Sequence, residues 1–196
     1  MPVSPPFAYS AERHLRRHGP RGYADSQHFK PWLRDEFQFR CVYCLIRERW
    51  HPDGDGGFSV EHLRPRSRSP ELAAEYDNLF YACCRCNAAK QDLEGILNPA
   101  TEPLANHLLV SSDGAIQGLT EAGVELIKVC QLDRARLVEF RRSIFQLWQM
   151  IEASDDQILP TLVAETALHA ASFDWGLAVR WRRAEKDSVE LVALWD

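Results

Sequence analysis

The sequence predicts an α+β protein in which a small core with short strands is flanked by helices. Three observations support this fold class. Two Cys-x-x-Cys pairs lie 38 residues apart, and they consist of Cys41, Cys44, Cys83 and Cys86. A short apolar run between the pairs, residues 58–63 (FSVEHL), has the length of a strand. Longer segments before and after the pairs repeat apolar residues at helical spacing.

Charge and composition divide the chain into three parts. Residues 1–24 form an extended basic arm with a Pro-rich start, residues 25–97 form the core, and residues 98–196 form a mostly helical acidic region. Residues 1–90 carry 14 Lys and Arg against 11 Asp and Glu, whereas residues 91–196 carry 9 against 17. The net charge of −5 therefore combines a basic front half, typical of a nucleic-acid partner, with an acidic rear half.

The N-terminal arm carries a basic patch, Arg13–His18 followed by Arg21. Such a patch either binds a phosphate backbone or stays solvated, and the sequence leaves both interpretations open. A helix is expected next, over Ser26–Phe37, with an apolar stripe that packs against the first Cys pair. The stripe consists of Phe29, Trp32, Leu33 and Phe37.

The four paired cysteines predict a structural zinc ion. Each pair places two thiolates on one tight turn, and zinc–sulfur bonds of about 2.3 Å tie the two turns together. The gap between the pairs is longer than the roughly 15–20 residues of a compact zinc ribbon, so a further element is inserted there. The alternative is a set of ordinary buried thiols. Cys84, which lies between two of the ligands, is expected to be a packed free thiol.

The inserted element carries residue types that can hydrolyse a phosphodiester. That reaction needs a general base to deprotonate water and a cation to stabilise charge in the transition state. We predict that His62 is the base and that Glu61 is an oxygen ligand of a divalent metal. Because neighbouring side chains of a strand point to opposite faces, this pair is expected where the strand ends or bends, just before Pro65. The alternative is a surface pair without a metal.

Two asparagines complete the predicted catalytic set. Asn87, in the first turn of the helix expected after Cys86, provides a second oxygen ligand, and two such ligands suit Mg²⁺ or Mn²⁺. Asn78 orients His62 and fixes the tautomer that leaves one ring nitrogen free. The alternatives are a turn residue at Asn78 and a helix cap at Asn87.

Five basic side chains around this set are candidate nucleic-acid contacts. They are Arg64, Arg66, Arg68, Arg85 and Lys90. The first three follow the Glu-His pair at alternating positions, where they can meet phosphates beside the metal. For Arg85 and Lys90 the alternative is a solvated helix face.

These residues together resemble the HNH endonucleases of the ββα-metal class that carry a Cys₄ zinc site. The shared pattern consists of Glu61-His62-x-x-Pro65, Asn78-Leu79 and Cys83-x-x-Cys86-Asn87-x-x-Lys90. It covers about residues 40–92, and Glu61 stands where aspartate is commoner in that family. The resemblance implies a small ββα core with structural zinc and catalytic Mg²⁺ or Mn²⁺.

The rest of the chain is similar to a bacterial subgroup found with retrons and Septu-type antiphage systems. The similarity rests on Asn98-Pro99, His107, Ser112-Asp113-Gly114, Thr120-x-x-Gly123 and Leu132-Asp133-Arg134-x-x-Leu137-Val138-x-x-Arg141-Arg142. It implies a role in antiviral defence, with a partner ATPase or a retron component.

The acidic region is expected to form a hairpin near residues 111–116 and helices over about 120–131, 134–153 and 160–184. The second helix has an apolar stripe formed by Leu137, Phe140, Ile144, Phe145, Trp148 and Ile151. The helices either cover the core as a bundle or provide a docking surface for a partner or a second subunit. His107 and His169 are expected to be structural.

The sequence thus predicts a metal-dependent endonuclease that nicks or cuts DNA, with RNA and homo-oligomerisation left open. The alternative is a zinc-dependent module that binds nucleic acid or protein through an idle HNH site. The complete set of Glu61, His62, Asn78 and Asn87 favours the enzyme. No apolar run is long enough for a membrane span or a signal peptide, and zinc-type cysteines suit a reducing compartment, so we expect a cytoplasmic protein.

Overall fold

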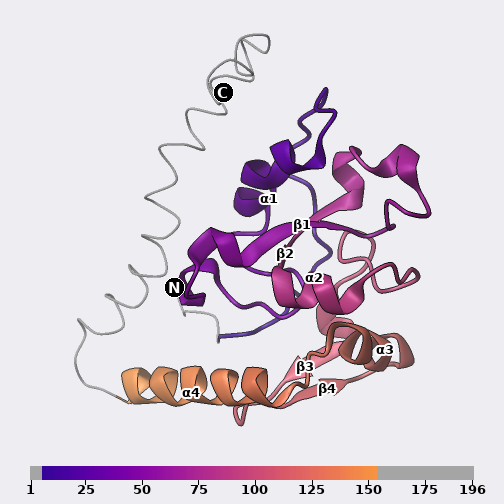
Figure 1. Cartoon of the computed structure of the whole chain (residues 1–196). Helices are drawn as coiled ribbons and strands as arrows, with labels where there is room; N and C mark the ends of the chain where they lie inside the picture. The colour runs from indigo at the N-terminus through magenta and orange to yellow at the C-terminus, as the bar shows by residue number, and fades with distance from the viewer. Residues whose placement is uncertain (1–5, 154–196) are drawn as a thin grey trace. The chain divides into compact units, whose positions relative to one another are not determined.

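The computed structural model describes residues 6–153, and its elements confirm the α+β class (Figure 1). The strands form two antiparallel pairs, β1 (Phe58–His62) with β2 (Leu79–Cys83) and β3 (Leu108–Val110) with β4 (Ile116–Gly118). The described helices are α1 (Lys30–Glu36), α2 (Cys84–Lys90), α3 (Glu121–Cys130) and α4 (Ala135–Glu152).

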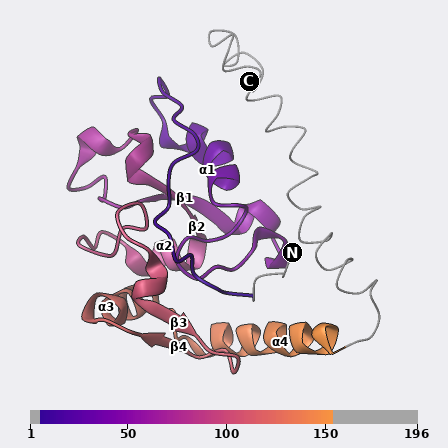
Figure 2. The ribbon, with the colours of Figure 1, turned by 180° about the vertical axis from the view of Figure 1, so that it is seen from behind.

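The β1–β2 hairpin and α2 form a ββα unit at the centre of the described chain. β1 and β2 pair from Phe58↔Cys83 to His62↔Leu79 without interruption. The chain then turns directly into α2, because Cys83 keeps an extended backbone and serves as the N-cap residue. Figures 1 and 2 show α1 on one side of the hairpin and α2 on the other. All five residues of β2 are consequently buried.

The helix predicted over Ser26–Phe37 is present as a 3₁₀ turn, Ser26–Phe29, followed by α1. The Asp25 side chain caps the turn by accepting a hydrogen bond from the Gln27 backbone N–H. The predicted apolar stripe is buried as expected, and Leu33 and Phe29 are the least exposed of its members. α1 also buries one acidic side chain, Glu36, at 2 % exposure.

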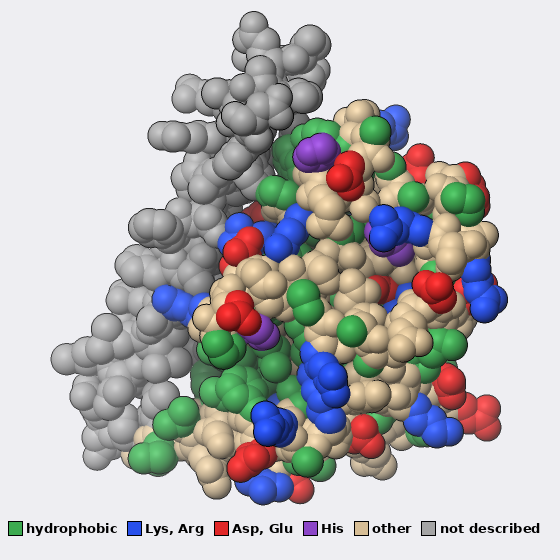
Figure 3. All heavy atoms as spheres, viewed as in Figure 1, with side chains coloured by type: hydrophobic (Ala, Val, Ile, Leu, Met, Phe, Trp, Pro, Cys, Tyr) green, Lys and Arg blue, Asp and Glu red, His purple; other side chains and the backbone are tan. Residues whose placement is uncertain are grey.

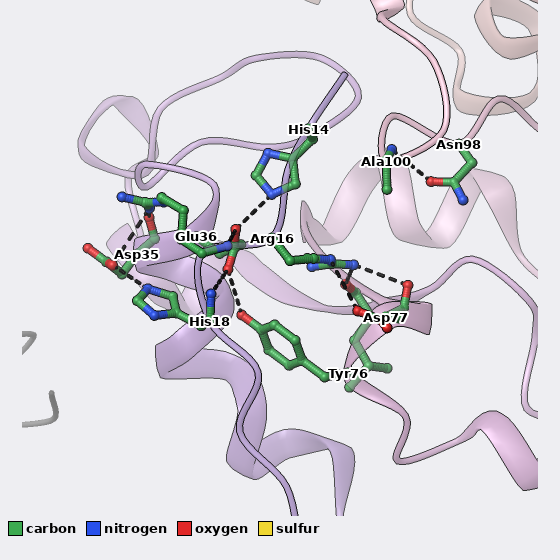
Figure 4. A network of polar contacts seen from close by, with 11 residues as sticks. His14, Arg16, His18, Asp35, Glu36, Tyr76, Asp77, Asn98 and Ala100 are labelled. Atoms are coloured by element: carbon green, nitrogen blue, oxygen red, sulfur yellow. Dashed lines mark hydrogen bonds and ion pairs between the residues drawn. The ribbon is translucent and has the colours of Figure 1, made fainter. Parts of the chain in front are cut away.

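The N-terminal arm runs along α1 and pairs with it. Within Arg13–His18, His14, Arg16 and His18 are partly buried while the residues between them are exposed. Figure 4 shows the His14 ring on Glu36, with Nε2 2.8 Å from Oε1, and the His18 ring 2.6 Å from Oδ2 of Asp35. The basic patch therefore has several of its side chains engaged inside the molecule.

Arg16 connects the arm to aromatic rings of the core. Its guanidinium lies over the rings of Phe37, Tyr76 and Phe80, and the distance to the Phe80 centroid is 4.6 Å. It also donates a hydrogen bond of 2.7 Å to the Leu79 carbonyl at the start of β2. Arg16 thus connects the arm to the hairpin through cation–π contacts and a backbone hydrogen bond.

The region behind the core begins with the predicted hairpin, β3–β4, and continues into α3 and α4. The Thr120 hydroxyl caps α3 by accepting from the Gly123 N–H, and Gln131 ends it in the left-handed conformation. At the hairpin turn, Gly114 has φ +84°, and a Cβ atom there would lie 2.2 Å from the Val138 carbonyl oxygen. Only glycine therefore allows this turn to pack against α4.

α4 packs its apolar side chains on the start of the chain and on the first Cys pair. Phe145 forms a buried cluster with Phe7 and Leu45, and Phe140 and Ile144 pack against that cluster. The described part of the C-terminal region therefore covers the core. The helix predicted over 160–184 and His169 lie outside the described residues. Within residues 6–153 no helix is both long and apolar enough to cross a membrane.

Candidate active site

The four paired cysteines come together in one buried cluster. All four Sγ atoms lie within 4.8 Å of one another, and Cys44 and Cys83 are 3.7 Å apart. A tetrahedral zinc ion with bonds of about 2.3 Å needs sulfur–sulfur distances of about 3.8 Å, so the cluster fits zinc. Cys84 lies outside the cluster and is exposed, so the expectation of a packed thiol is wrong for this residue.

The cluster joins the first cysteine turn to the ββα unit. Cys41 closes its turn with a hydrogen bond of 2.9 Å from its N–H to the Ile46 carbonyl, and the Val42 N–H donates to Tyr81 in β2. Burial and the neighbouring sulfur atoms raise the pKa of the Cys41 thiol well above its ordinary value. Burial therefore disfavours the thiolate of Cys41, and a bound cation would favour it.

Glu61 and His62 lie on opposite faces of β1, because the strand stays regular through His62. The pair lies where the strand ends, as expected, but β1 does not bend before it. Glu61 points into the interior at 1 % exposure, where its Oε1 is 2.7 Å from the Lys90 Nζ and accepts a hydrogen bond of 3.3 Å from the Tyr43 hydroxyl. Burial raises the pKa of Glu61, and the nearby Lys90 acts against that shift.

Lys90 does not lie on a surface that nucleic acid can reach. It has no exposed area, and besides the Glu61 contact its ammonium donates a hydrogen bond of 2.8 Å to the His62 carbonyl. The physical reason is the helical spacing of Asn87 and Lys90, which directs both side chains of α2 onto β1. Lys90 therefore holds the backbone of His62 and the carboxylate of Glu61 at once.

Asn87 lies on the same face of the hairpin as Glu61. Its Nδ2 donates to the Ser59 hydroxyl at 2.8 Å and to the Val60 carbonyl at 3.3 Å. Its side-chain oxygen, Oδ1, accepts no hydrogen bond within the described part of the chain. Glu61 and Asn87 thus offer oxygen donors of the type that Mg²⁺ and Mn²⁺ prefer, although Lys90 already binds one oxygen of Glu61.

His62 is half-buried at the end of β1. Its Nε2 lies 3.0 Å from the Ala73 carbonyl oxygen, and a carbonyl can only accept, so Nε2 carries the ring proton of the neutral form. Nδ1 is then left with a free lone pair. Burial lowers the pKa of His62, and the positive charges of Arg66 and Lys90 contribute in the same direction. These effects favour the neutral form of the ring, which can accept a proton.

Asn78 holds the loop that follows β1. Its Oδ1 accepts from the Arg64 N–H at 2.8 Å, and its Nδ2 donates to the carbonyls of Arg64 and Leu72. Its backbone carbonyl accepts from the Leu63 N–H at 2.9 Å. The Ala73 carbonyl, and not the Asn78 side chain, is the hydrogen-bond partner of the His62 ring, so Asn78 positions His62 only through the neighbouring backbone.

The remaining basic candidates are on the surface. Arg64, Arg66, Arg68 and Arg85 are all exposed. On the face seen in Figure 3, basic side chains are interspersed with acidic ones over the described surface. In the loop between β1 and β2, an exposed arginine stands at every second position from Arg64 to Arg68.

Two contacts of this site were not expected from the sequence. The Ala73 carbonyl is a backbone group, so no residue type marks it. Tyr43 lies between the two cysteines of the first pair, and its position gives no sign that its hydroxyl reaches Glu61. A signal did exist for Lys90, because Asn87 and Lys90 are three residues apart and must share one face of α2.

Comparison with known proteins agrees with this geometry. Residues 41–93 match the family model described as HNH endonuclease, so the ββα unit and its cysteines form an HNH endonuclease domain. The chain is also similar to the Septu protein PtuB of Bacillus thuringiensis, with 31% identity over 103 residues. That match covers 48% of this chain and 38% of the relative, so this chain spans well under half the length of the curated protein it matches.

Proposed function

We propose that this chain is a metal-dependent HNH endonuclease that nicks or cuts DNA, with His62 as the general base. The observation that carries the proposal is the state of the His62 ring. Its Nε2–H is held by the Ala73 carbonyl, its Nδ1 is free, and its pKa is lowered by burial. A general base must be neutral and oriented before the reaction starts, and these contacts meet both requirements.

The reaction proposed for the site is hydrolysis of a phosphodiester. His62 Nδ1 takes a proton from the attacking water, and the Ala73 carbonyl stabilises the imidazolium that forms. Glu61 and Asn87 would hold Mg²⁺ or Mn²⁺, and the ion would supply positive charge for the scissile phosphate. Because β1 is regular and places Glu61 and His62 on opposite faces, the end of the strand would have to turn for this ion and the His62 ring to meet at one phosphate. Lys90 fixes the backbone carbonyl of His62 and thereby the position of the ring.

Substrate binding is proposed to use the loop between β1 and β2. Arg64, Arg66 and Arg68 are exposed there, and Asn78 fixes the backbone of the first of them. Arg85 on α2 adds a further exposed cation on the same domain. One guanidinium group can donate hydrogen bonds to two oxygens of the same phosphate. The exposed arginines of this loop can therefore bind the phosphates of a nucleic-acid backbone.

The similarity to a Septu protein supports a role in antiphage defence. We propose that the chain is an effector of such a system and acts with a partner ATPase or a retron component. This context predicts weak cleavage by the isolated chain and strong cleavage by the complex. Full activity of the purified chain, together with no detectable partner binding, would contradict it.

A second candidate function is a zinc-dependent binding module with an idle HNH site. The ion pair between Glu61 and Lys90 favours this alternative, because it uses one oxygen of the predicted metal ligand. Under this alternative, the loop between β1 and β2 binds DNA, but the chain does not cleave the DNA, whichever divalent metal ion is added.

The test is cleavage of supercoiled plasmid by the zinc-loaded chain in Mg²⁺, Mn²⁺ or EDTA, beside His62→Ala. We expect nicked or linear plasmid with a divalent metal, no product in EDTA, and no product from the variant. A folded wild-type chain that binds plasmid yet cleaves it in neither metal, alone or with a partner, would favour the binding module.

A further inference from the structure

Arg141, in the middle of α4, is the largest fully buried side chain of the described residues. One of its nitrogens, Nη1, donates a hydrogen bond of 2.9 Å to the Leu132 carbonyl. Its Nε and Nη2 are buried and have no hydrogen-bond partner among residues 6–153. A buried guanidinium needs an opposite charge nearby, because desolvation of an unpaired ion costs several kcal/mol.

Within the described part of the chain, no carboxylate forms an ion pair with Arg141. Burial lowers the pKa of Arg141, whereas Tyr9, Cys44 and Cys86 act in the opposite direction. The Phe7 ring, whose centroid is 5.8 Å from the guanidinium carbon, provides a cation–π contact but no anion. Cys44 and Cys86 belong to the cysteine cluster, so thiolates held there by a cation would favour the charged form of Arg141.

Arg134, which directly precedes α4, approaches the same cluster from one side. Its Nη1 lies 3.9 Å from the Cys86 Sγ and 2.9 Å from the Gln131 carbonyl oxygen. Burial alone would lower the pKa of Arg134, but Cys86, Cys44 and Cys83 raise it overall. Arg134 thus lies against the cysteine cluster, and Arg141, seven residues further along the chain, is influenced by sulfur atoms of the same cluster.

The charges balance when zinc is bound. Four thiolates around one Zn²⁺ carry a net charge of −2, and burying such a centre without counter-ions is unfavourable. Arg134 and Arg141 carry +2 together. By contrast, Arg136 and Arg142 on the same segment are exposed, and Arg142 donates to the Asp113 carbonyl of the hairpin turn.

We propose that Arg134 and Arg141 are the counter-ions of the zinc–thiolate centre, and that zinc binding thereby docks the first half of α4 onto the HNH domain. This role explains why two charged residues lie on the buried side of an otherwise apolar stripe. It is independent of the proposed nuclease activity, because neither arginine belongs to the Glu61–His62 site. Its consequence is that zinc loss releases α4 as well as the two cysteine turns.

Zinc retention provides the first test. The full-length, zinc-loaded chain is mixed with excess 4-(2-pyridylazo)resorcinol, and the rate of zinc transfer is followed by absorbance. Removing an outer contact of a metal site typically weakens binding by about 10-fold to 100-fold. We expect Arg141→Met and Arg134→Gln to release zinc on the order of tenfold faster than the wild type. Arg136→Gln, the exposed control, should match the wild type.

The Arg141→Lys variant distinguishes the effect of the positive charge on zinc retention from the effect of side-chain packing. It keeps the positive charge in a different shape, so it should retain zinc better than Arg141→Met. If the Arg141→Met variant does not fold, the Arg134→Gln variant provides the test, because Arg134 is only partly buried and its replacement should leave the fold intact. Release rates equal to the wild type in both the Arg134→Gln and the folded Arg141 variants would overturn the counter-ion role.

Hydrogen–deuterium exchange tests the docking of α4. In the wild-type chain, removal of zinc by a chelator should raise exchange over residues 135–145 as much as over the cysteine turns. The same segment should exchange faster in Arg134→Gln than in Arg136→Gln while zinc is still bound. Unchanged protection of residues 135–145 after zinc removal would contradict the coupling between zinc and α4.

Discussion

The N-terminal arm and the loop between β1 and β2 are both basic, but they use their cations in different ways. In the arm, His14, Arg16 and His18 face the core and pair with α1 or stack on aromatic rings. In the loop, Arg64, Arg66 and Arg68 alternate in the same manner, yet all three are exposed.

The difference follows from the carboxylates that lie beside each segment. The arm runs beside Asp35 and Glu36, two adjacent carboxylates at the end of α1, which bind its histidines and backbone. Among the described residues, the arginines of the loop have one ion-pair partner, Glu94, which lies 3.9 Å from Arg68 and is itself exposed. A basic run is therefore available to nucleic acid only where the fold places no buried carboxylate beside it.

The largest effect should come from removing Glu36, which holds the arm. Burial would raise the pKa of Glu36, but His14 and the backbone N–H groups of Arg17 and His18 lower it to about 2. A shift from 4.5 to about 2 corresponds to roughly 3 kcal/mol of stability. Glu36→Ala should lose about that much in urea unfolding at pH 7, whereas exposed Glu75→Ala should lose little.

The same carboxylate gives this effect a pH dependence. Because the folded pKa of Glu36 is depressed, its contribution is complete above about pH 4.5 and is lost as the pH falls through about 2. The difference between wild type and Glu36→Ala should therefore shrink from pH 7 to pH 3. A constant difference would show that Glu36 stabilises the fold by packing alone.

The next largest effect should come from the loop. Changing Arg64, Arg66 and Arg68 to Gln together should weaken DNA binding by about tenfold or more, without lowering stability. If each arginine binds one phosphate, the slope of log K against log salt should fall by about 2.7. Fluorescence anisotropy with labelled DNA, measured on the His62→Ala background, gives both values. An unchanged slope would place the DNA on another face.

The pH dependence of cleavage should show a smaller effect. His62 has a lowered pKa, so it stays neutral and able to act as a base below pH 6.5. The acid limb of the cleavage rate should therefore lie below pH 6.5 and be absent from any residual activity of His62→Ala. An acid limb above pH 6.5 would mean that another group controls the rate.

The smallest effect is expected from the outward residues of the arm. Arg13 and Arg21 are exposed and lie at opposite ends of the basic patch. Changing both to Gln should alter DNA affinity by about twofold at most and leave the urea midpoint unchanged. The same anisotropy and unfolding measurements apply. A loss as large as that of the loop variant would show that the arm also binds DNA.

The sequence predicted those features that depend on local spacing. The cysteine pairs indicated the cluster of four cysteines, and apolar periodicity placed α1, α3 and α4 within a residue or a few of their observed bounds. The same is true of the hairpin at β3–β4. Each of these features is set by residues close together in the chain, for which period and ligand spacing are sufficient.

The arrangement inside the candidate site could not be obtained in this way. The faces of Glu61 and His62 depend on where β1 ends, and the pairing of His62 with Leu79 extends the regular strand past Glu61. The environment of the His62 ring depends on a backbone carbonyl, that of Ala73, eleven residues further on. Such contacts arise from tertiary packing, and no residue type or spacing in the sequence indicates them.

The most direct test of the account is the single-turnover cleavage rate of His62→Ala beside His107→Ala, under a condition in which the wild type cleaves. His107 bonds Thr120 and Glu102 away from the ββα unit and serves as the matched control. We predict a loss of about 10²-fold to 10⁴-fold for His62→Ala, partial rescue by added imidazole, and no change for His107→Ala. Cleavage by His62→Ala at the wild-type rate would contradict the role of His62 as the general base.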